Sequence, residues 1–153
     1  MPDIQRTLVL LKPDAVQREL VGDVLHRFER KGLKFIAMKL IHLDETTLAE
    51  HYSHHTEKPF YKGLVEFMMQ TPVVAIVFEG IDVVAEMRKI LGSTNPREAD
   101  AGTVRADFSM DLAGNIAHAS DTAENAQIEI DRFFKADELF DYKKLTDQYH
   151  FGE

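Results

Sequence analysis

The chain has 153 residues, of which 44% are hydrophobic and 29% charged, a balance typical of a globular domain with a sizeable core. It has no cysteine, which excludes a disulfide framework and a Cys-based zinc site. The net charge of -8 comes without a basic block and argues against a nucleic-acid-binding protein. The N-terminal apolar run is too short for a signal peptide or a membrane span. We therefore expect one domain over residues 1–153, in a cytoplasmic protein without membrane contacts.

The first part of the chain predicts two strands with a helix between them. Residues 6–11 read as a buried strand, and residues 33–43 alternate between apolar and polar side chains as a second strand does. Between them, one helical face is marked by Val21, Val24, Leu25 and Phe28. Gly32 follows this face at the position where glycine commonly ends a helix.

The middle of the chain predicts two short helices and a third strand. Asp44 is expected to cap a helix that carries Leu48 and Tyr52, and residues 60–70 form the next one. The apolar run at residues 73–79 predicts another buried strand.

The third strand leads into a helix and then into an irregular segment. Asp82 is expected to cap a helix over residues 83–91 that Gly92 ends. Residues 92–114 show no sustained period, and a loop of this length in a compact domain is often functional.

The last part of the chain predicts a short strand at residues 115–117 and a further helix. Capping-box spacing from Asp121 to Glu124 starts this helix, which ends near Phe134. The aromatic tail from Lys135 onward is expected to pack on the surface or on a neighbouring subunit. The whole order predicts an α+β sandwich, a sheet with helices covering one face.

Three histidines form an H-x-x-H-H cluster at His51, His54 and His55. Because no third acidic or cysteine ligand follows at a recognisable spacing, a surface or ligand-facing role is favoured over a metal site. The sequence has neither G-x-x-x-x-G-K-[ST] nor G-x-G-x-x-G, so any phosphate must be held without a glycine-rich loop.

Arginines gather in and before the irregular segment. Arg88 precedes it, and Thr94, Arg97 and Arg105 lie within it. Guanidinium groups match phosphate oxygens, although the segment alone is equally consistent with a solvated loop.

The stretch "NIAHASDT" at residues 115–122 follows, with His118 at its centre. It can be the end of a strand with a turn and a helix cap, or it can present a histidine nucleophile.

This stretch resembles the active-site signature of the nucleoside diphosphate kinases, N-x-x-H-[GA]-S-D. "VLLKPDAVQRELVGDVLHRFERKG", "HYSHHTEKPFYKGLVEFM", "LGSTNPREADAGTVRADF" and "EIDRFF" are similar to the same family, in the family's order. The resemblance runs from about Arg6 into the C-terminal tail. Ala119 stands where the family more often has glycine, and Thr122 where it has a smaller residue. If residue 119 needed a positive φ, alanine would cost on the order of 1 kcal/mol there.

The resemblance implies a ferredoxin-like fold, an antiparallel four-stranded sheet covered by helices. It implies an enzyme that transfers the γ-phosphoryl group of a nucleoside triphosphate, chiefly ATP, to a nucleoside diphosphate. The route is a ping-pong mechanism through a phosphohistidine on His118, with Mg²⁺ held mainly by the nucleotide phosphates and no metal ligand assigned to the protein. The implied partners are these nucleotides and further copies of the chain, with a hexamer favoured and a tetramer possible.

The resemblance also assigns roles to individual residues. Nucleotide-binding positions fall on Lys12, Phe60, Arg88, Thr94, Arg105 and Asn115, and Phe60 stacks on the base with Leu112 opposite it. Tyr52, Ser120 and Glu129 match residues that support the histidine and its phosphate. A catalytically silent nucleotide-binding or scaffolding relative is the alternative. The presence of His118 and of the arginines favours the enzyme over this alternative.

Overall fold

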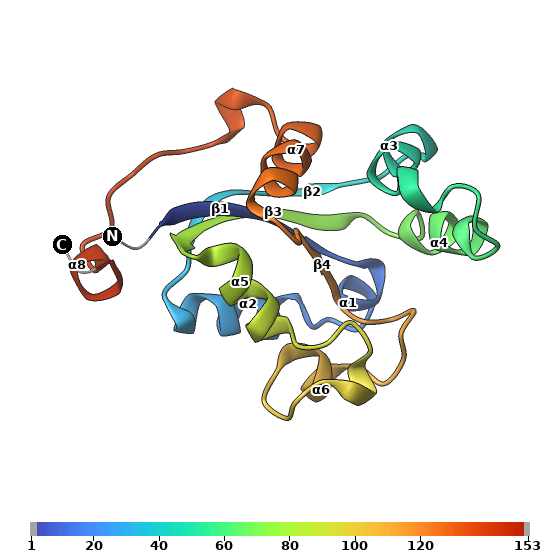
Figure 1. Ribbon diagram of the computed structural model, residues 1–153, viewed down its shortest axis with the longest axis horizontal. Coiled ribbons are helices and arrows are strands. Elements are labelled where there is room, and N and C mark those ends of the chain that lie inside the picture. The colour runs from blue at the N-terminus through green and yellow to red at the C-terminus, as the bar shows by residue number, and fades with distance from the viewer. Residues whose placement is uncertain (1–2, 152–153) are drawn as a thin grey trace.

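The computed structural model describes residues 3–151 and is organised around one antiparallel sheet (Figure 1). The strands lie in the order β2-β3-β1-β4. Their bounds are Ile4–Leu11 for β1, Lys34–Ile41 for β2, Val73–Ile81 for β3 and Ala117–Ala119 for β4. In the central strand β1, Leu8 pairs with Val77 of β3 and Leu10 with His118 of β4. The predicted α+β fold with a four-stranded antiparallel sheet is confirmed.

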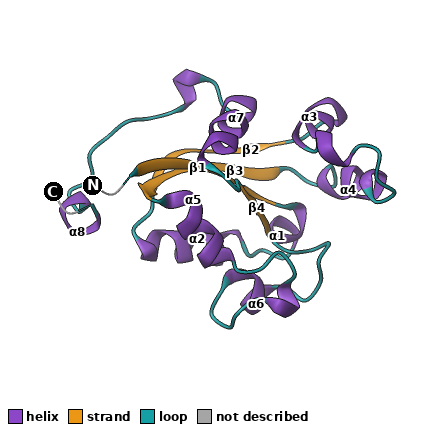
Figure 2. Cartoon of the chain, viewed as in Figure 1, coloured by secondary structure: helices purple, strands orange, loops and turns teal. Residues whose placement is uncertain are grey.

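Helices cover both faces of this sheet (Figure 2). On one face, Val9 and Leu11 of β1 belong to a core cluster that also includes residues of α2 (Val21–Lys31) and α5 (Val83–Leu91). On the other face, Leu8 and Leu10 belong to a cluster with residues of three helices. These are α3 (Glu45–His51), α4 (Tyr61–Met68) and α7 (Ala123–Phe133). The prediction that helices cover one face was wrong, since an unbroken apolar run such as residues 8–11 is the pattern of a strand buried on both faces.

Of three predicted helix boundaries, at Gly32, Asp44 and Asp82, two follow from local chemistry. Gly32 ends α2 with a left-handed φ of 94°, and the Asp44 side chain accepts a hydrogen bond from the Thr47 amide at the start of α3. Asp82 does precede α5, but its side chain makes no capping bond and its φ is 47°. A capping side chain normally needs an extended backbone to reach the first amides of the helix, so the predicted cap was wrong.

The segment after residue 114 differs from the prediction by one or two residues. Strand β4 begins at Ala117, and Asn115 and Ile116 form a turn before it in which Ile116 has a φ of 74°. Thr122, not Asp121, caps α7 by accepting a hydrogen bond from the Asn125 amide. The capping box predicted from Asp121 to Glu124 was therefore wrong by one residue. Ala119 is not among the residues with positive φ, so the expected strain at this position does not arise.

Several short helices escaped the sequence analysis because they are too short to show a period. They are α1 (Pro13–Gln17), η1 (Ser53–His55), η2 (Pro96–Glu98), α6 (Val104–Phe108), η3 (Ala136–Glu138) and α8 (Asp147–His150). Two of them, η2 and α6, interrupt the loop expected over residues 92–114.

The C-terminal tail runs along the edge strand β2. The Phe140 amide donates to the Ile36 carbonyl at 3.0 Å, and the Tyr142 hydroxyl donates to the Phe35 carbonyl at 2.6 Å. The predicted packing of the tail on the surface is thus confirmed. Within residues 3–151, no helix combines the length and the apolar character that crossing a membrane requires.

Candidate active site

A pocket of about 1080 Å³ opens beside the end of β4. Its walls come from the end of β1, from the segment around η1 and α4, from α5 and the following loop, and from α7. The side chains that the sequence analysis assigns to the nucleotide all line this pocket: Lys12, Phe60, Arg88, Thr94, Arg105 and Asn115. The fold therefore brings together residues that lie more than a hundred positions apart.

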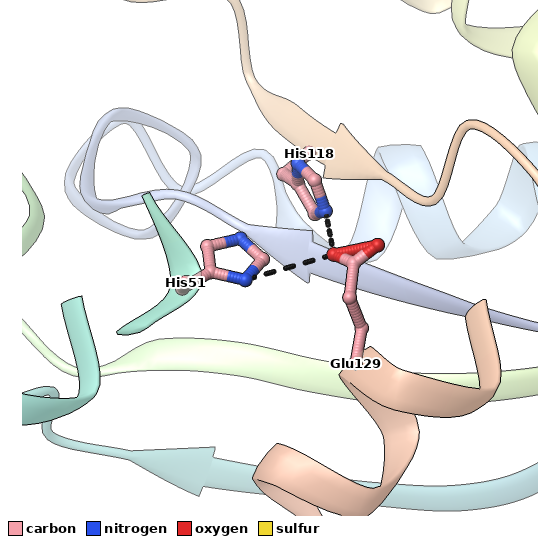
Figure 3. A group of neighbouring side chains, drawn as sticks. All are labelled: His51, His118 and Glu129. Atoms are coloured by element: carbon pink, nitrogen blue, oxygen red, sulfur yellow. Dashed lines mark hydrogen bonds and ion pairs between the residues drawn. The ribbon is translucent and has the colours of Figure 1, made fainter. Parts of the chain in front are cut away.

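His118 lies in the middle of β4 and faces into this pocket. Its neighbours Ala117 and Ala119 pack into the core cluster on one face of the sheet, so the imidazole projects on the other face. The His118 Nε2 atom is hydrogen-bonded to the Glu129 carboxylate on α7 (Figure 3). This bond holds the ring in one orientation and leaves Nδ1 outside it.

A second imidazole lies beside the same carboxylate oxygen, Glu129 Oε2, and next to the ring of His118 (Figure 3). The Nδ1 atom of His51 is 3.6 Å from Glu129 Oε2, and the ring centroids of His51 and His118 are 4.5 Å apart at an angle of 81°. Arg132 Nη1 donates to His51 Nδ1 at 2.9 Å. Burial first, and then the nearby charge of His118 and Arg132, lower the pKa of His51 far below its usual range, so His51 stays neutral.

The trio of His51, His118 and Glu129 has the residue types of a metal site, with ligand atoms within 4.8 Å of one another. However, His118 Nε2 and the Glu129 carboxylate are already bonded to each other, and Arg132 occupies His51 Nδ1. Mg²⁺ prefers oxygen ligands in octahedral geometry, whereas this trio offers two nitrogens. The trio therefore does not fit Mg²⁺.

The predicted H-x-x-H-H cluster divides in the structure. His51 joins the buried trio with His118 and Glu129. His54 and His55 line the exposed part of the pocket, with ring centroids 3.8 Å apart.

The turn before β4 is held from several sides. Ile116 has a φ of 74°, which is unusual for a β-branched residue. The Ile116 amide donates to Asp14 Oδ2 at 3.0 Å, and the Lys12 amide donates to the Ile116 carbonyl at 2.8 Å. Arg105 donates to the carbonyls on either side, from Nε to Asn115 at 3.1 Å and from Nη2 to Ala117 at 2.6 Å. A strained turn persists only when its surroundings fix it in this way.

Several cationic side chains lie close together in the more buried part of the pocket. Lys12 Nζ donates to Asn115 Oδ1 at 2.7 Å, and Asn115 Nδ2 donates to the Thr94 carbonyl at 3.0 Å. Burial first, and then the neighbouring charge of Arg105, lower the pKa of Lys12 to about 8. Burial and Arg88 lower the pKa of Arg105 to about 10. Because the positive charges of these groups repel one another, a bound anion would stabilise their charged forms.

The opposite end of the pocket is exposed and largely apolar. Phe60 and Leu112 retain 52% and 55% of their surface exposure. The Phe60 ring contacts His55 edge-on at 5.2 Å, and Lys58 Nζ lies 5.8 Å from its centroid. This end therefore offers an open aromatic face. We refer to Lys12, Arg105, Asn115, His118 and Glu129 as the buried end, and to His54, His55, Phe60 and Leu112 as the exposed end.

The remaining predicted site residues differ in position. Tyr52 lines the pocket, and burial, then the charge of Glu129, raise the pKa of its hydroxyl, so this group stays protonated. Ser120 is fully buried outside the pocket lining, and its Oγ accepts from the Leu8 amide at 3.2 Å. Arg97, part of the arginine-rich segment, is exposed and is absent from the described lining.

Sequence reasoning missed two side chains that build the site, Asp14 and Arg132, and gave His51 only the surface or ligand-facing role expected of the three-histidine cluster. The motif around Asp14 was noted only for its resemblance to the family. Arg132 lies within "EIDRFF", which was noted only for its resemblance to the family, and nothing in that motif points to its partner His51 on another helix.

Comparisons with known proteins identify the family of the chain. Residues 5–139 match the family described as nucleoside diphosphate kinase. A nucleoside diphosphate kinase of Methanobrevibacter smithii is 49% identical over 92% of this chain and 93% of its own length. That of Pyrococcus horikoshii is 45% identical over 98% of both chains. The structure of a halophilic nucleoside diphosphate kinase from Halobacterium salinarum in complex with CDP superposes with a TM-score of 0.92 at 40% identity, covering 97% of this chain and 98% of that one. The chain belongs to the nucleoside diphosphate kinase family.

Proposed function

We propose that the chain performs its family's reaction, phosphoryl transfer from a nucleoside triphosphate to a nucleoside diphosphate, through a phosphohistidine on His118. The single observation that carries this mechanism is the bond from His118 Nε2 to Glu129, which leaves Nδ1 as the free nitrogen in a pocket with three cations, Lys12, Arg88 and Arg105. The burial of His51 keeps that second imidazole neutral, so it adds no positive charge beside the nucleophile.

The transfer takes place in two half-reactions. In the first, the His118 Nδ1 lone pair attacks the γ-phosphorus, the bond from phosphorus to the bridging oxygen breaks, and the diphosphate leaves with that electron pair. In the second, a terminal oxygen of the acceptor diphosphate attacks the phosphorus, and the phosphorus–nitrogen bond breaks to restore neutral His118. Glu129 accepts a hydrogen bond from the Nε2–H group and stabilises the positive charge that the ring carries between the two steps.

Phosphoryl transfer requires mainly alignment and stabilisation of charge. Lys12, Arg88 and Arg105 supply positive charge beside His118 without a glycine-rich loop, and Thr94 and Asn115 add polar contacts. Divalent metal use belongs to this family's chemistry. We propose that Mg²⁺ reaches the site on the nucleotide, whose phosphate oxygens are the ligands it prefers.

The exposed end suits a base of any kind. Phe60 presents a ring face, and Leu112, an apolar residue that also lines the pocket and is half exposed, is its proposed partner on the other side of the base. The CDP bound by the Halobacterium salinarum relative supports a nucleotide at this site. Because stacking uses the π-face of a base, we expect ADP, GDP, CDP, UDP and TDP to be accepted with efficiencies within roughly two orders of magnitude. A preference above about a thousandfold would indicate hydrogen bonds to one base edge.

The assembly we propose is a homo-oligomer, with a hexamer favoured and a tetramer possible. Exposed apolar side chains on the edge strand, Met38 and Leu40, support association of copies. Light scattering should give six or four chains, and a stable, fully active monomer would contradict the proposal. The cytoplasmic location and a single domain over residues 1–153 stay predictions.

The test of the mechanism is phosphorylation of the isolated chain by γ-labelled ATP. Label that is lost in acid should appear on His118 and leave when any nucleoside diphosphate is added. His118→Asn should keep the fold and abolish labelling, because an amide cannot accept the phosphoryl group. Undiminished transfer by His118→Asn would reject the phosphohistidine. Nucleotide binding without any labelling of the parent chain would support the silent relative instead.

A further inference from the structure

Arg132 is a half-buried cation that the mechanism above does not use. It lies on α7, one turn after Glu129, and its side chain is 14% exposed. Its Nη1 donates to His51 Nδ1 at 2.9 Å, while its Nε lies 4.0 Å from Glu50 Oε2, beyond hydrogen-bond distance. The close polar contact of Arg132 is therefore with the imidazole beside the nucleophile.

This contact determines which nitrogen of His51 carries the proton. A guanidinium group has only N–H donors, so His51 Nδ1 must be the acceptor and must lack a proton. The imidazole of His51 is 2% exposed and neutral, so its proton sits on Nε2. Within the described part of the chain, this Nε2 atom has no hydrogen-bond partner.

The opposite tautomer would be favoured if Arg132 were absent. A proton on His51 Nδ1 would point toward Glu129 Oε2, which is 3.6 Å away, and a small movement would close a hydrogen bond. That bond would also avoid the cost of a buried N–H group without a partner. The same oxygen, Glu129 Oε2, is the one bonded to His118 Nε2, so the two imidazoles would compete for it.

We propose that Arg132 is a positioning residue that fixes the tautomer of His51 and so reserves the Glu129 carboxylate for His118. The inference rests on the proposed role of His118 as the nucleophile. Arg132 acts through two contacts of His51: its distance to Glu129, and the edge-on packing of its ring against His118 at 4.5 Å. Neither contact requires Arg132 to touch the nucleotide.

The tautomer can be read directly by NMR on the full chain labelled with ¹⁵N-histidine. The parent should show His51 with a protonated Nε2 and an unprotonated Nδ1, with the signal assigned by its loss in His51→Phe. Arg132→Leu should move the proton to Nδ1, whereas Arg132→Lys, which keeps a cationic donor, should retain the parent tautomer. A parent His51 protonated on Nδ1 would overturn the proposal without any activity measurement.

Transfer kinetics test the consequence for His118. Arg132→Leu should slow single-turnover phosphorylation of the enzyme by about tenfold, the effect of one misplaced hydrogen bond. The KM for the triphosphate should stay within about twofold, and Arg132→Lys should recover most of the rate. Arg30→Leu is the matched control, because Arg30 is exposed on α2, which packs on the other face of the sheet.

A double-mutant cycle separates this role from direct nucleotide binding. If Arg132 acts through His51, Arg132→Leu should add no further loss in a His51→Phe background. A full additional loss, or a rise in KM, would assign Arg132 to the nucleotide and overturn the proposal. A changed tautomer with an unchanged rate would also overturn it. Failure of the proposed function can be told apart from failure of this inference. It would appear as undiminished labelling of His118→Asn, while the tautomer of His51 stays as expected.

Discussion

The two ends of the pocket are built in different ways. At the buried end, Arg105 is 8% exposed and each of its three guanidinium nitrogens donates to a backbone carbonyl, while His118 is fixed by Glu129. At the exposed end, Phe60 is 52% exposed and its described contacts are those of its ring with His55 and Lys58. Hydrogen bonds to the backbone and to α7 thus fix the side chains of the buried end, whereas the Phe60 ring of the exposed end lies on the surface.

The difference corresponds to what each end is proposed to do. Transfer of a phosphoryl group depends on alignment to within a fraction of an ångström, so its groups need support from the framework. Stacking on a base tolerates movement and any base identity. Substitutions at the buried end should therefore reduce both stability and transfer, whereas substitutions at the exposed end should reduce binding alone.

The largest effect is expected for Arg105→Ala. This change removes donors from the carbonyls of Gly92, Asn115 and Ala117 and releases the strained turn before β4. Loss of three hydrogen bonds from a guanidinium group to backbone carbonyls predicts a decrease of about 3–5 kcal/mol in the free energy of unfolding. Phosphorylation of His118 should slow by about a hundredfold to a thousandfold. Denaturant unfolding and single-turnover labelling measure the two effects, and an unchanged stability would reject the framework role.

Arg88→Ala should separate binding of phosphate from support of the fold. Arg88 lines the pocket from α5 but is exposed, so its loss should change the free energy of unfolding by no more than about 0.5 kcal/mol. Transfer should still fall by about tenfold to a hundredfold, and Arg88→Lys should recover only part of it, because lysine cannot form a bidentate contact. If both Arg88→Ala and Arg105→Ala transfer phosphate at the parent rate, the cations of this pocket are not the phosphate site.

Lys12 predicts a pH dependence that is particular to the buried end. Its pKa of about 8 means that the free protein loses this charge as the pH rises through 8, so nucleotide affinity should fall by up to about tenfold per pH unit above that point. A bound polyanion raises the pKa again, and binding at pH 9 should therefore take up a proton. Calorimetry in two buffers with different heats of ionisation measures this uptake.

Lys12→Arg provides the control for that titration, since arginine stays protonated throughout this range and proton uptake should vanish. The same shift affects folding. Because the folded pKa lies below the ordinary value of 10.5, the unfolded chain binds more protons between these two values, and the contribution of Lys12 to stability rises with pH in this window. Proton uptake of equal size in Lys12→Arg would assign the titration to another group.

The comparison of the two ends also explains which parts of the structure were accessible from the sequence. The apolar residues of α2 follow a helical period, and those of β1 and β3 form continuous runs, so these three elements could be predicted closely. The turn at Asn115 and Ile116 could not, because its conformation is imposed by Asp14, Lys12 and Arg105 from other elements. Local preference alone made residues 115–117 look like the strand.

The residues of the candidate site also differ in whether the sequence could predict them. His118 and the residues assigned to the nucleotide could be proposed because each lies in a motif of contiguous residues. The chain of contacts from Arg132 through His51 to Glu129 could not, since it joins α3 to α7 and depends on how both helices pack on the sheet. A residue whose role is exerted through a distant neighbour leaves no pattern in its own segment.

The smallest effect is expected for Phe60→Ala, which removes the aromatic face of the exposed end. The side chain is half exposed, so stability should change little, and the rate of transfer at saturating nucleotide should stay within about threefold. Loss of stacking, worth about 1–3 kcal/mol per base, should raise the KM by about tenfold. Phe60→Tyr should keep the parent KM because it keeps the ring. The measurement is steady-state kinetics with ADP, GDP, CDP, UDP and TDP. An equal loss for all five would follow from stacking, whereas a loss confined to one base would show that this end reads base edges and would remove the contrast between the two ends.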